Sequence, residues 1–268
     1  MDVLAASEPA ILADKHYDAP SVFTASGLLR EARRQKGITD APVPKVCVLD
    51  PDGDLVRRLR CDERAGKDPN WACYHTELFR LNEPGFEIGV VGCAVGAPFA
   101  VLVAEQLFES GCQLLINITS AGQLVPLRPP PYFVLIERAL RDEGTSHHYL
   151  APARFAHAPP SLLDRLRGSF DDVGIPVVCG ATWTTDAPFR ETAAAITKHR
   201  AEGLLAVEME AAALYAFAAA RQRDVICFAM VTNQMAQAAI DFEKGEADGS
   251  AAALALIRAV MNCTTERK

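Results

Sequence analysis

Short apolar runs alternate with longer amphipathic runs over most of the chain, and this alternation constrains the fold more than any other feature. The short runs predict buried strands at 46–49, 87–91, 114–118, 132–136, 177–179 and 225–231. Between and after them, the apolar spacing predicts helices at 97–110, 161–170, 191–202, 208–221 and 250–261. Strands separated by helices predict a layered α/β fold with a central mixed, mainly parallel sheet flanked by helices.

The size of the chain favours a single domain. Its 268 residues, of which 50% are hydrophobic, suffice to build one large core. The first part of the chain differs, because it contains Pro20 and Pro42 and a basic stretch from Arg30 to Lys36 that is typical of a solvated amphipathic helix. We therefore expect a partly helical N-terminal extension at 1–43 and the main domain at 44–268.

Charge and cysteine content exclude several classes of protein. The formal net charge of -7 offers no basic surface for a nucleic acid, so a small-molecule partner is expected instead. The eight cysteines are scattered without a C-x-x-C pair, which favours a reducing compartment over a disulfide framework or a metal site. Residues 1–10 lack a signal-peptide pattern, and no apolar run reaches the roughly 18 residues that span a bilayer. We expect a soluble, cytoplasmic protein without a cofactor.

Ligands of α/β sheets gather at the carboxyl ends of strands, so the segments that follow the expected strands are candidates for a binding site. Gly92 to Pro98 forms a glycine-bearing turn before a helix, which suits either a close backbone approach to a ligand or an ordinary tight turn. Thr119, Ser120, Ala121 and Gly122 follow another strand. Their hydroxyl and backbone N–H groups are able to hold an anion or a sugar, although an ordinary polar turn explains them equally well.

Two carboxylates interrupt an apolar stretch at Glu208-Met209-Glu210. Burial of charge is costly unless the charge is paired or hydrogen-bonded, so the presence of two acids in an apolar stretch requires an explanation. One explanation is the favourable dipole at a helix N-terminus. The other is a pair of acceptors for the vicinal hydroxyls of ribose, which requires the two side chains to converge at a strand-to-helix junction.

A fourth segment, residues 180–192, follows a strand and precedes a helix. Asp186 suits a helix cap. Phe189 suits either the core or a stacking contact, and Arg190 presents planar donors that match the edge of a base.

Taken together and in this order, these segments resemble the nucleoside phosphorylase family, which includes uridine phosphorylases, purine nucleoside phosphorylases and methylthioadenosine nucleosidases. The resemblance runs from about Val46 to Met261 and also includes the stretch 141–149. Its most specific part is Val207-Glu208-Met209-Glu210-Ala211-Ala212-Ala213. A dinucleotide-binding fold fits less well, because Gly92 to Pro98 lacks the complete glycine fingerprint.

The resemblance implies a role for each candidate residue. It places Glu208, Met209 and Glu210 on the ribose, and it places Thr119 between ribose and phosphate. The Ser120-Ala121-Gly122 segment is then expected under the base, Phe189 is expected to stack on it, and Arg190 to contact its carbonyl oxygens. Asn233 stands where purine-specific members carry an aspartate that protonates the base, which favours a pyrimidine. The catalytic set is thus expected to be Glu210, Arg190 and Asn233, with no metal.

The phosphate site departs from the family pattern. Two arginines that hold phosphate in the family are replaced by residues of the segments 49–54 and 116–119. Arg57, Arg58, Arg60 and Arg80 are candidates for a substitute cation. The family also takes a histidine from a neighbouring subunit, for which His16 and His75 are candidates.

The expected reaction is cleavage of an N-glycosidic bond by a pentosyltransferase that uses phosphate as co-substrate. A pyrimidine nucleoside is favoured, and a homo-oligomer is expected. Positioning and electrostatics account for catalysis without a covalent intermediate. The missing arginines leave hydrolysis by water open, and a nucleoside-binding homologue without activity is the third possibility.

Overall fold

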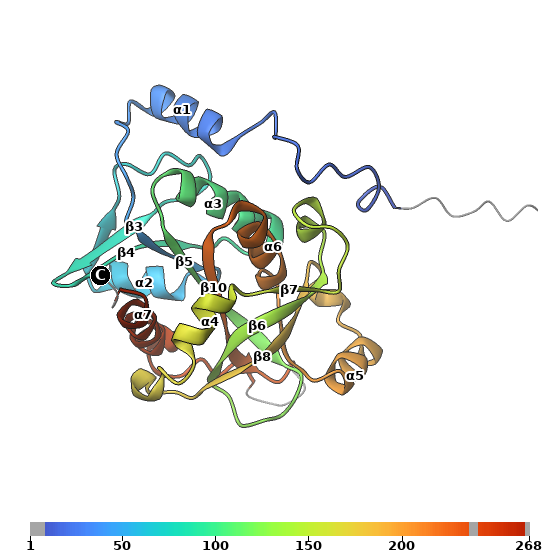
Figure 1. The fold of residues 1–268 in the computed structure, drawn as a ribbon. Helices are drawn as coiled ribbons and strands as arrows, with labels where there is room; N and C mark the ends of the chain where they lie inside the picture. The colour runs from blue at the N-terminus through green and yellow to red at the C-terminus, as the bar shows by residue number, and fades with distance from the viewer. Residues whose placement is uncertain (1–8, 236–240, 266–268) are drawn as a thin grey trace, which may run out of the picture.

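The computed structural model describes residues 9–235 and 241–265, and Figure 1 shows them as a central sheet with helices around it. The ten strands are β1 (Val46–Asp50), β2 (Ala65–Lys67), β3 (Phe79–Glu83), β4 (Phe86–Gly92), β5 (Leu114–Gln123), β6 (Tyr132–Asp142), β7 (Phe155–His157), β8 (Val177–Thr185), β9 (Leu204–Glu208) and β10 (Asp224–Asn233). The helices are α1 (Ala25–Lys36), α2 (Asp54–Cys61), α3 (Ala97–Glu109), α4 (Pro160–Leu166), α5 (Ala193–Ala201), α6 (Ala211–Arg221) and α7 (Ser250–Thr265).

Five strands close on themselves. The strand order runs β10-β6-β8-β9-β5-β1-β4-β3-β2, and an additional pairing joins β10 to β5. Strands β5, β10, β6, β8 and β9 therefore form a closed ring, from which β1, β4, β3 and β2 extend as an open wing. The pairs β1–β4, β1–β5 and β10–β5 are parallel, whereas β5–β9 and β10–β6 are antiparallel. The expected mixed α/β sheet in a single domain is confirmed.

Burial explains why the central strands are continuous apolar runs. Nine of the ten residues of β10 are buried or half-buried, since helices cover one face and the closed ring covers the other. A fully buried tyrosine on α6 joins two strands of the ring: the Tyr215 hydroxyl donates to the Ile136 carbonyl at 2.6 Å and accepts from the Cys227 N–H at 3.0 Å. This helix is thereby fixed against the ring that carries the site.

The N-terminal part contains α1, which lies along the outside of the molecule near α3 in Figure 1. The Thr24 hydroxyl caps its first turn by accepting from the Gly27 N–H, and Gly37 ends it in the left-handed conformation. Leu29 and Ala32 are buried beside Ala72 in a small cluster separate from the main core. The expected helix in this region is present, and residues 1–8 of the expected extension lie outside the described residues.

Several expected boundaries were wrong. Strand β5 continues to Gln123 and β8 continues to Thr185, so Ser120–Gly122 and Thr182–Thr185 lie in strands where turns were expected. Glu208 ends strand β9 and does not start a helix. Helix α4 ends at Leu166 rather than 170, and α5 begins at Ala193. Strands β2, β3, β7 and β9 and helix α2 were not expected, because a run of three to eight residues carries too little periodicity.

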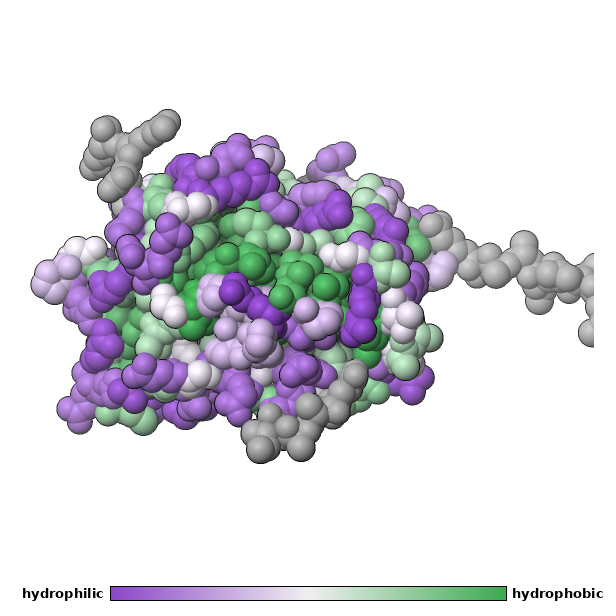
Figure 2. All heavy atoms as spheres, turned by 90° about the horizontal axis from the view of Figure 1, so that it is seen from below, coloured by the Kyte–Doolittle hydropathy of each residue, from purple (hydrophilic) through white to green (hydrophobic). Residues whose placement is uncertain are grey.

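No helix in the described part of the chain is long and apolar enough to cross a membrane. The face shown in Figure 2 carries apolar side chains gathered near its centre, with hydrophilic side chains around them.

Candidate active site

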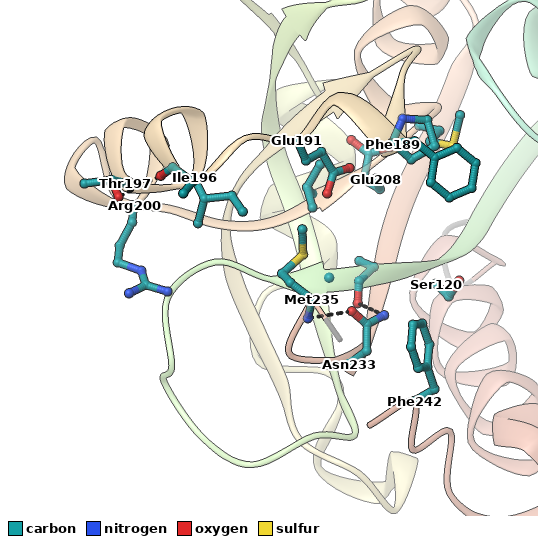
Figure 3. A pocket seen from close by; sticks show the side chains of 16 residues that line it. Ser120, Phe189, Glu191, Ile196, Thr197, Arg200, Glu208, Asn233, Met235 and Phe242 are labelled. Carbon is teal, nitrogen blue, oxygen red and sulfur yellow. Dashed lines mark hydrogen bonds between the residues drawn. The ribbon is translucent and has the colours of Figure 1, made fainter. Parts of the chain in front are cut away.

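A cavity of about 750 Å³ lies where β5, β9 and β10 end. Its volume is in the range of small-molecule sites. Figure 3 shows the side chains that line it. Three groups form the wall: the ends of the strands, the segment between β8 and α5 together with α5, and the segment after β10. The lining residues are Ser120, Ala121, Gly122, Val207, Glu208, Met209, Asn233, Pro188, Phe189, Glu191, Ala193, Ile196, Thr197, Arg200, Met235 and Phe242. Seven of the ten residues predicted for the site are among them.

The absence of a side chain at Gly122 leaves space for Asn233 and Met235, which pack against it. A Cβ atom at this position would overlap the Met235 sulfur and would lie 3.3 Å from the Asn233 Oδ1 atom. Glycine therefore lets the end of β10 approach β5 closely. Gly122 lines the cavity, although it belongs to a strand and not to the expected turn. Its position under a base stays a prediction.

Glu208 is fully hydrogen-bonded inside the protein. Its Oε1 atom accepts from the hydroxyls of Thr182 at 3.1 Å and Thr184 at 2.5 Å, and its Oε2 atom accepts from the backbone N–H groups of Glu210 and Ala211, both at 2.7 Å. A carboxylate has about four acceptor positions, so no free one remains. Burial raises the pKa of Glu208, and these donors oppose the rise. Glu208 therefore anchors the start of α6 to β8, although its side chain also borders the cavity.

Glu210 occupies a different environment two residues later. It is 1% exposed, and its Oε1 atom accepts from the Gly96 N–H at 2.7 Å. Its Oε2 atom is buried without a hydrogen-bond partner in the described structure. Burial, followed by the nearby charge of Glu208, raises the pKa of Glu210 to about 8, while the Gly96 N–H and the Thr119 hydroxyl oppose the rise. Glu210 lines neither cavity, and its Oε2 atom without a partner lies in a carboxyl group close to Thr119.

The junction between β9 and α6 explains why the side chains of Glu208 and Glu210 lie near each other. Glu208 is the last residue of β9 and Glu210 is the N-cap of α6, so the strand-to-helix junction brings both side chains to the same end of the sheet. Gly96, at the turn between β4 and α3, is tied to this junction through Glu210. The glycine-bearing turn thus contributes a backbone N–H to the site.

The segment after β8 carries an aromatic residue at the cavity but not the expected guanidinium. Phe189 lines the cavity while 99% exposed, so it stands at the rim. Arg190, the last residue of the short 3-10 turn Pro188–Arg190, is exposed and is not among the lining residues. Glu191 and, from α5, Arg200 line the cavity in its place. The Arg200 Nε atom donates to the Leu124 carbonyl at 2.6 Å.

Asn233 lies in the cavity wall as expected. Its Oδ1 atom accepts from the Met235 N–H at 3.0 Å, and its Nδ2 atom donates to the Thr232 hydroxyl at 3.2 Å and approaches the Ala121 carbonyl at 3.5 Å. The amide is therefore held between the ends of β10 and β5.

A second, much smaller cavity of about 30 Å³ adjoins the first, and Ser120 lines both. Thr119 lines the small cavity together with Asp50, Asp52, Asp54 and Asp248. Burial, with the nearby charges of Asp52 and Asp54, raises the pKa of Asp50 to about 6 despite a hydrogen bond from the Val56 N–H. The two segments in which the family's phosphate arginines are replaced meet at this cavity, and four of its fourteen lining residues are aspartates.

The arginines expected to replace the missing phosphate ligands point elsewhere. Arg57 pairs with Asp54 while exposed, Arg58 pairs with Asp62 at 2.7 Å, Arg60 lies over the Phe79 ring, and Arg80 pairs with Asp68 and Glu87, both at 2.6 Å. None of them lines the small cavity. The cation among its lining residues is Lys244, which pairs with Asp52 at 3.0 Å and with Asp54.

Sequence reasoning missed Glu191, Arg200 and Lys244. Glu191 directly follows a residue that was singled out, and only the local turn decides which of the two side chains enters the cavity. Lys244 is 190 residues away from Asp54 in the chain, so nothing local connects them. His16 and His75 are exposed and do not line either cavity of this chain, so their role toward a neighbouring subunit stays a prediction.

The chain is similar in sequence and in fold to known proteins. The chain is 26% identical over 183 residues to the guanosine phosphorylase of Halorubrum lacusprofundi, which covers 68% of this chain and 75% of that protein. It is 26% identical over 158 residues to a DeoD-type purine nucleoside phosphorylase of Brevibacillus brevis, covering 56% and 65%.

The fold is similar to that of a solved structure, the uridine phosphorylase of Vibrio fischeri, with a TM-score of 0.72, 20% identity, and coverage of 87% of this chain and 99% of that one. The family model of the phosphorylase superfamily matches residues 46–262. This chain therefore belongs to the phosphorylase superfamily, as the resemblance of its sequence to nucleoside phosphorylases led us to expect.

Proposed function

We propose that this protein cleaves the N-glycosidic bond of a nucleoside by phosphorolysis. The base occupies the larger cavity, and the ribose lies at its inner end, near Thr119 and Glu210. The observation that carries the proposal is the Oε2 atom of the buried Glu210 carboxyl, which has no hydrogen-bond partner in the described structure and lies near Thr119, a lining residue of the smaller cavity. A buried acceptor without a partner is costly, so a hydroxyl of a bound ligand is its natural complement.

The residues supply binding and charge stabilisation rather than a covalent intermediate. As the bond to the base breaks, positive charge develops on the sugar. In its ionised form, which prevails above about pH 8, the Glu210 carboxylate accepts from a ribose hydroxyl and stabilises this charge more strongly in the transition state than in the bound substrate. A phosphate oxygen forms the new bond to the anomeric carbon as the bond to the base breaks. The base leaves as an anion, which the polar donors of the larger cavity stabilise and which takes its proton from solvent. The relatives named above support a glycosyl transfer of this kind.

Lys244 is proposed to attract the phosphate. It is the cation among the residues that line the small cavity beside Thr119 and Ser120. Phosphate binding requires that Lys244 exchange its carboxylate partners for phosphate oxygens, and that the narrow cavity open. Ser120 lines both cavities, so a phosphate held at this position would lie near the larger one.

Hydrolysis is the second candidate, and the carboxylates favour it. Asp50, Asp52, Asp54 and Asp248 surround the same cavity, and their charge opposes a dianion. A buried carboxylate whose pKa is about 6, such as that of Asp50, is also suited to accept a proton from water near neutral pH.

The sugar product distinguishes the two reactions. With phosphate present, we expect ribose 1-phosphate and a rate of base release that saturates with phosphate concentration. Free ribose, released at a rate that is indifferent to phosphate, would instead establish hydrolysis. Binding of nucleosides without turnover would support the third possibility, an inactive binding protein.

Replacement of Lys244 by methionine is expected to weaken phosphate binding by about 10- to 150-fold, since a hydrogen bond to a charged group contributes about 1.5–3 kcal/mol. The apparent KM for phosphate measures this effect. Arg57→Met is the matched control, because Arg57 also pairs with Asp54 but does not line the cavity. An equal phosphate KM in wild type and Lys244→Met would contradict the role of Lys244.

A pyrimidine nucleoside is the proposed substrate class. The neutral amide of Asn233 lines the base cavity and lacks the proton that a purine-specific acid would deliver to the leaving base. The named purine and guanosine phosphorylases support a purine instead. We expect uridine to react with a higher kcat/KM than inosine or adenosine in a panel assay. A panel in which only purine nucleosides react would show that the argument from Asn233 was wrong.

A further inference from the structure

Glu191 presents an unoccupied carboxyl group to the base cavity. It follows the 3-10 turn Pro188–Arg190, its side chain is half-buried, and it lines the cavity. No hydrogen bond or ion pair joins this carboxyl to any residue of the described chain. Burial alone raises the pKa of Glu191 to about 7. A carboxyl that loses solvent without gaining a partner is left ready to bind a ligand.

Neither of the other charged groups of the cavity is paired with Glu191, and burial is the cause of its raised pKa. Of the lining residues, the ionisable ones besides Glu191 are Glu208 on β9 and Arg200 on α5. Glu208 accepts four hydrogen bonds, and Arg200 donates to the Leu124 carbonyl. The facing segments of β5 and β10 contribute uncharged Ser120 and Asn233. Neither cationic nor anionic neighbours therefore fix the protonation state of Glu191.

Position within the cavity suggests which part of a ligand Glu191 meets. Phe189 and Glu191 come from one short segment, and Figure 3 shows them on one side of the cavity, with Asn233 and Phe242 on the other. The proposed ribose position, at Thr119 and Glu210, is formed by β5 and α6 instead. An aromatic ring and a carboxyl on the same wall suit the face and the edge of a planar heterocycle.

We infer that Glu191 contacts the hydrogen-bonding edge of the base and selects bases by the protonation state of its own carboxyl group. This inference rests on the proposed function. As a carboxylate, Glu191 accepts from the ring N–H of a lactam base, such as N3 of uracil or N1 of hypoxanthine. Adenine and cytosine carry a lone pair at the corresponding ring nitrogen, which the carboxylate repels. As a carboxylic acid, Glu191 donates to that nitrogen and accepts from the neighbouring amino group.

The ratio of kcat/KM for uridine to that for cytidine tests the inference, because the two substrates share the same sugar. The protonation of Glu210 and of phosphate changes the rates of both substrates equally, so these effects of pH cancel in the ratio. In wild type we expect the ratio to exceed about 10 at pH 8.5, in line with a hydrogen bond to a charged group, and to fall as the pH decreases through about 7. The ratio of inosine to adenosine is expected to change in the same direction.

Glu191→Gln removes the titration and presents both a carbonyl oxygen and an amino group. The ratio is expected to lose its pH dependence and most of its magnitude. Glu109→Gln, which removes the same charge from the exposed end of α3, is the matched control and should behave as wild type. Ratios in Glu191→Gln that equal those of wild type at each pH would overturn the inference.

Binding of free bases separates this inference from the proposed reaction. Titration calorimetry with uracil and with adenine, at pH 6 and 8.5, is expected to show the same change of preference in wild type and its loss in Glu191→Gln. If wild type cleaves no nucleoside but shows this pattern, the proposed function fails and the role of Glu191 stands. If uracil binds wild type and Glu191→Gln equally, or binds neither, the role of Glu191 is excluded.

Discussion

Glu210→Gln is expected to lower kcat/KM for nucleoside cleavage by about 10- to 150-fold while the protein stays folded, because a hydrogen bond to a charged group contributes about 1.5–3 kcal/mol. The amide oxygen of glutamine still accepts from the Gly96 N–H, so the tie between α6 and the turn before α3 is kept. The other oxygen is replaced by an amino group, which cannot accept from a ribose hydroxyl. Steady-state kinetics on each variant measure the loss, and Glu109→Gln serves as the control.

The same substitution is expected to change how stability depends on pH. The pKa of Glu210 in the folded protein is about 8, above its ordinary value of 4.5, so the folded state binds this proton more tightly than the unfolded state. Its contribution to stability is fully present below about pH 4.5 and is lost as the pH rises through about 8. Thermal melts at several pH values should show a smaller decrease of the melting temperature between about pH 4.5 and pH 8 in Glu210→Gln than in wild type. Unchanged activity together with an unchanged decline would contradict the assignment of Glu210.

Glu208→Ala is expected to destabilise the fold strongly. The substitution leaves the backbone N–H groups of Glu210 and Ala211 buried without an acceptor, and each such group costs about 1–3 kcal/mol. The hydroxyls of Thr182 and Thr184 lose the same acceptor but are free to rotate. A loss of about 2–6 kcal/mol is therefore expected from chemical denaturation, on the basis of the two fixed donors.

Glu208→Gln separates anchoring from a direct role in binding. Its amide oxygen can serve the two backbone donors, and its amino group can donate to the threonine hydroxyls, which rotate to accept. Stability close to that of wild type is expected. A well-folded Glu208→Gln variant that has lost cleavage would restore the ribose role that the sequence implied, whereas a stable Glu208→Ala variant would contradict the anchoring role.

Long and strongly apolar segments were predictable from the sequence. Strands β1, β4 and β10 and helices α3, α6 and α7 were expected close to where they occur, because their burial on several sides imposes a continuous apolar pattern or a helical period. Short edge elements such as β2 and β7 were not expected, since three residues carry no period. The extension of β5 through Thr119–Gly122 was missed because polar and small residues there lie in the site and not in the core.

The sequence by itself determined the family, the mixed α/β class and the segments that meet at the cavity, because these depend on residue types in a fixed order along the chain. Tertiary structure decided what each polar group does. The hydroxyls of two threonines on β8 donate to Glu208 and hold it in place, whereas one oxygen of Glu210 has no hydrogen-bond partner in the described structure. After the 3-10 turn Pro188–Arg190, the side chain of Glu191 lines the cavity and that of Arg190 does not. The tertiary fold places Lys244 beside two aspartates of the small cavity, Asp52 and Asp54. No local sequence pattern relates these residues, because they are far apart in the chain.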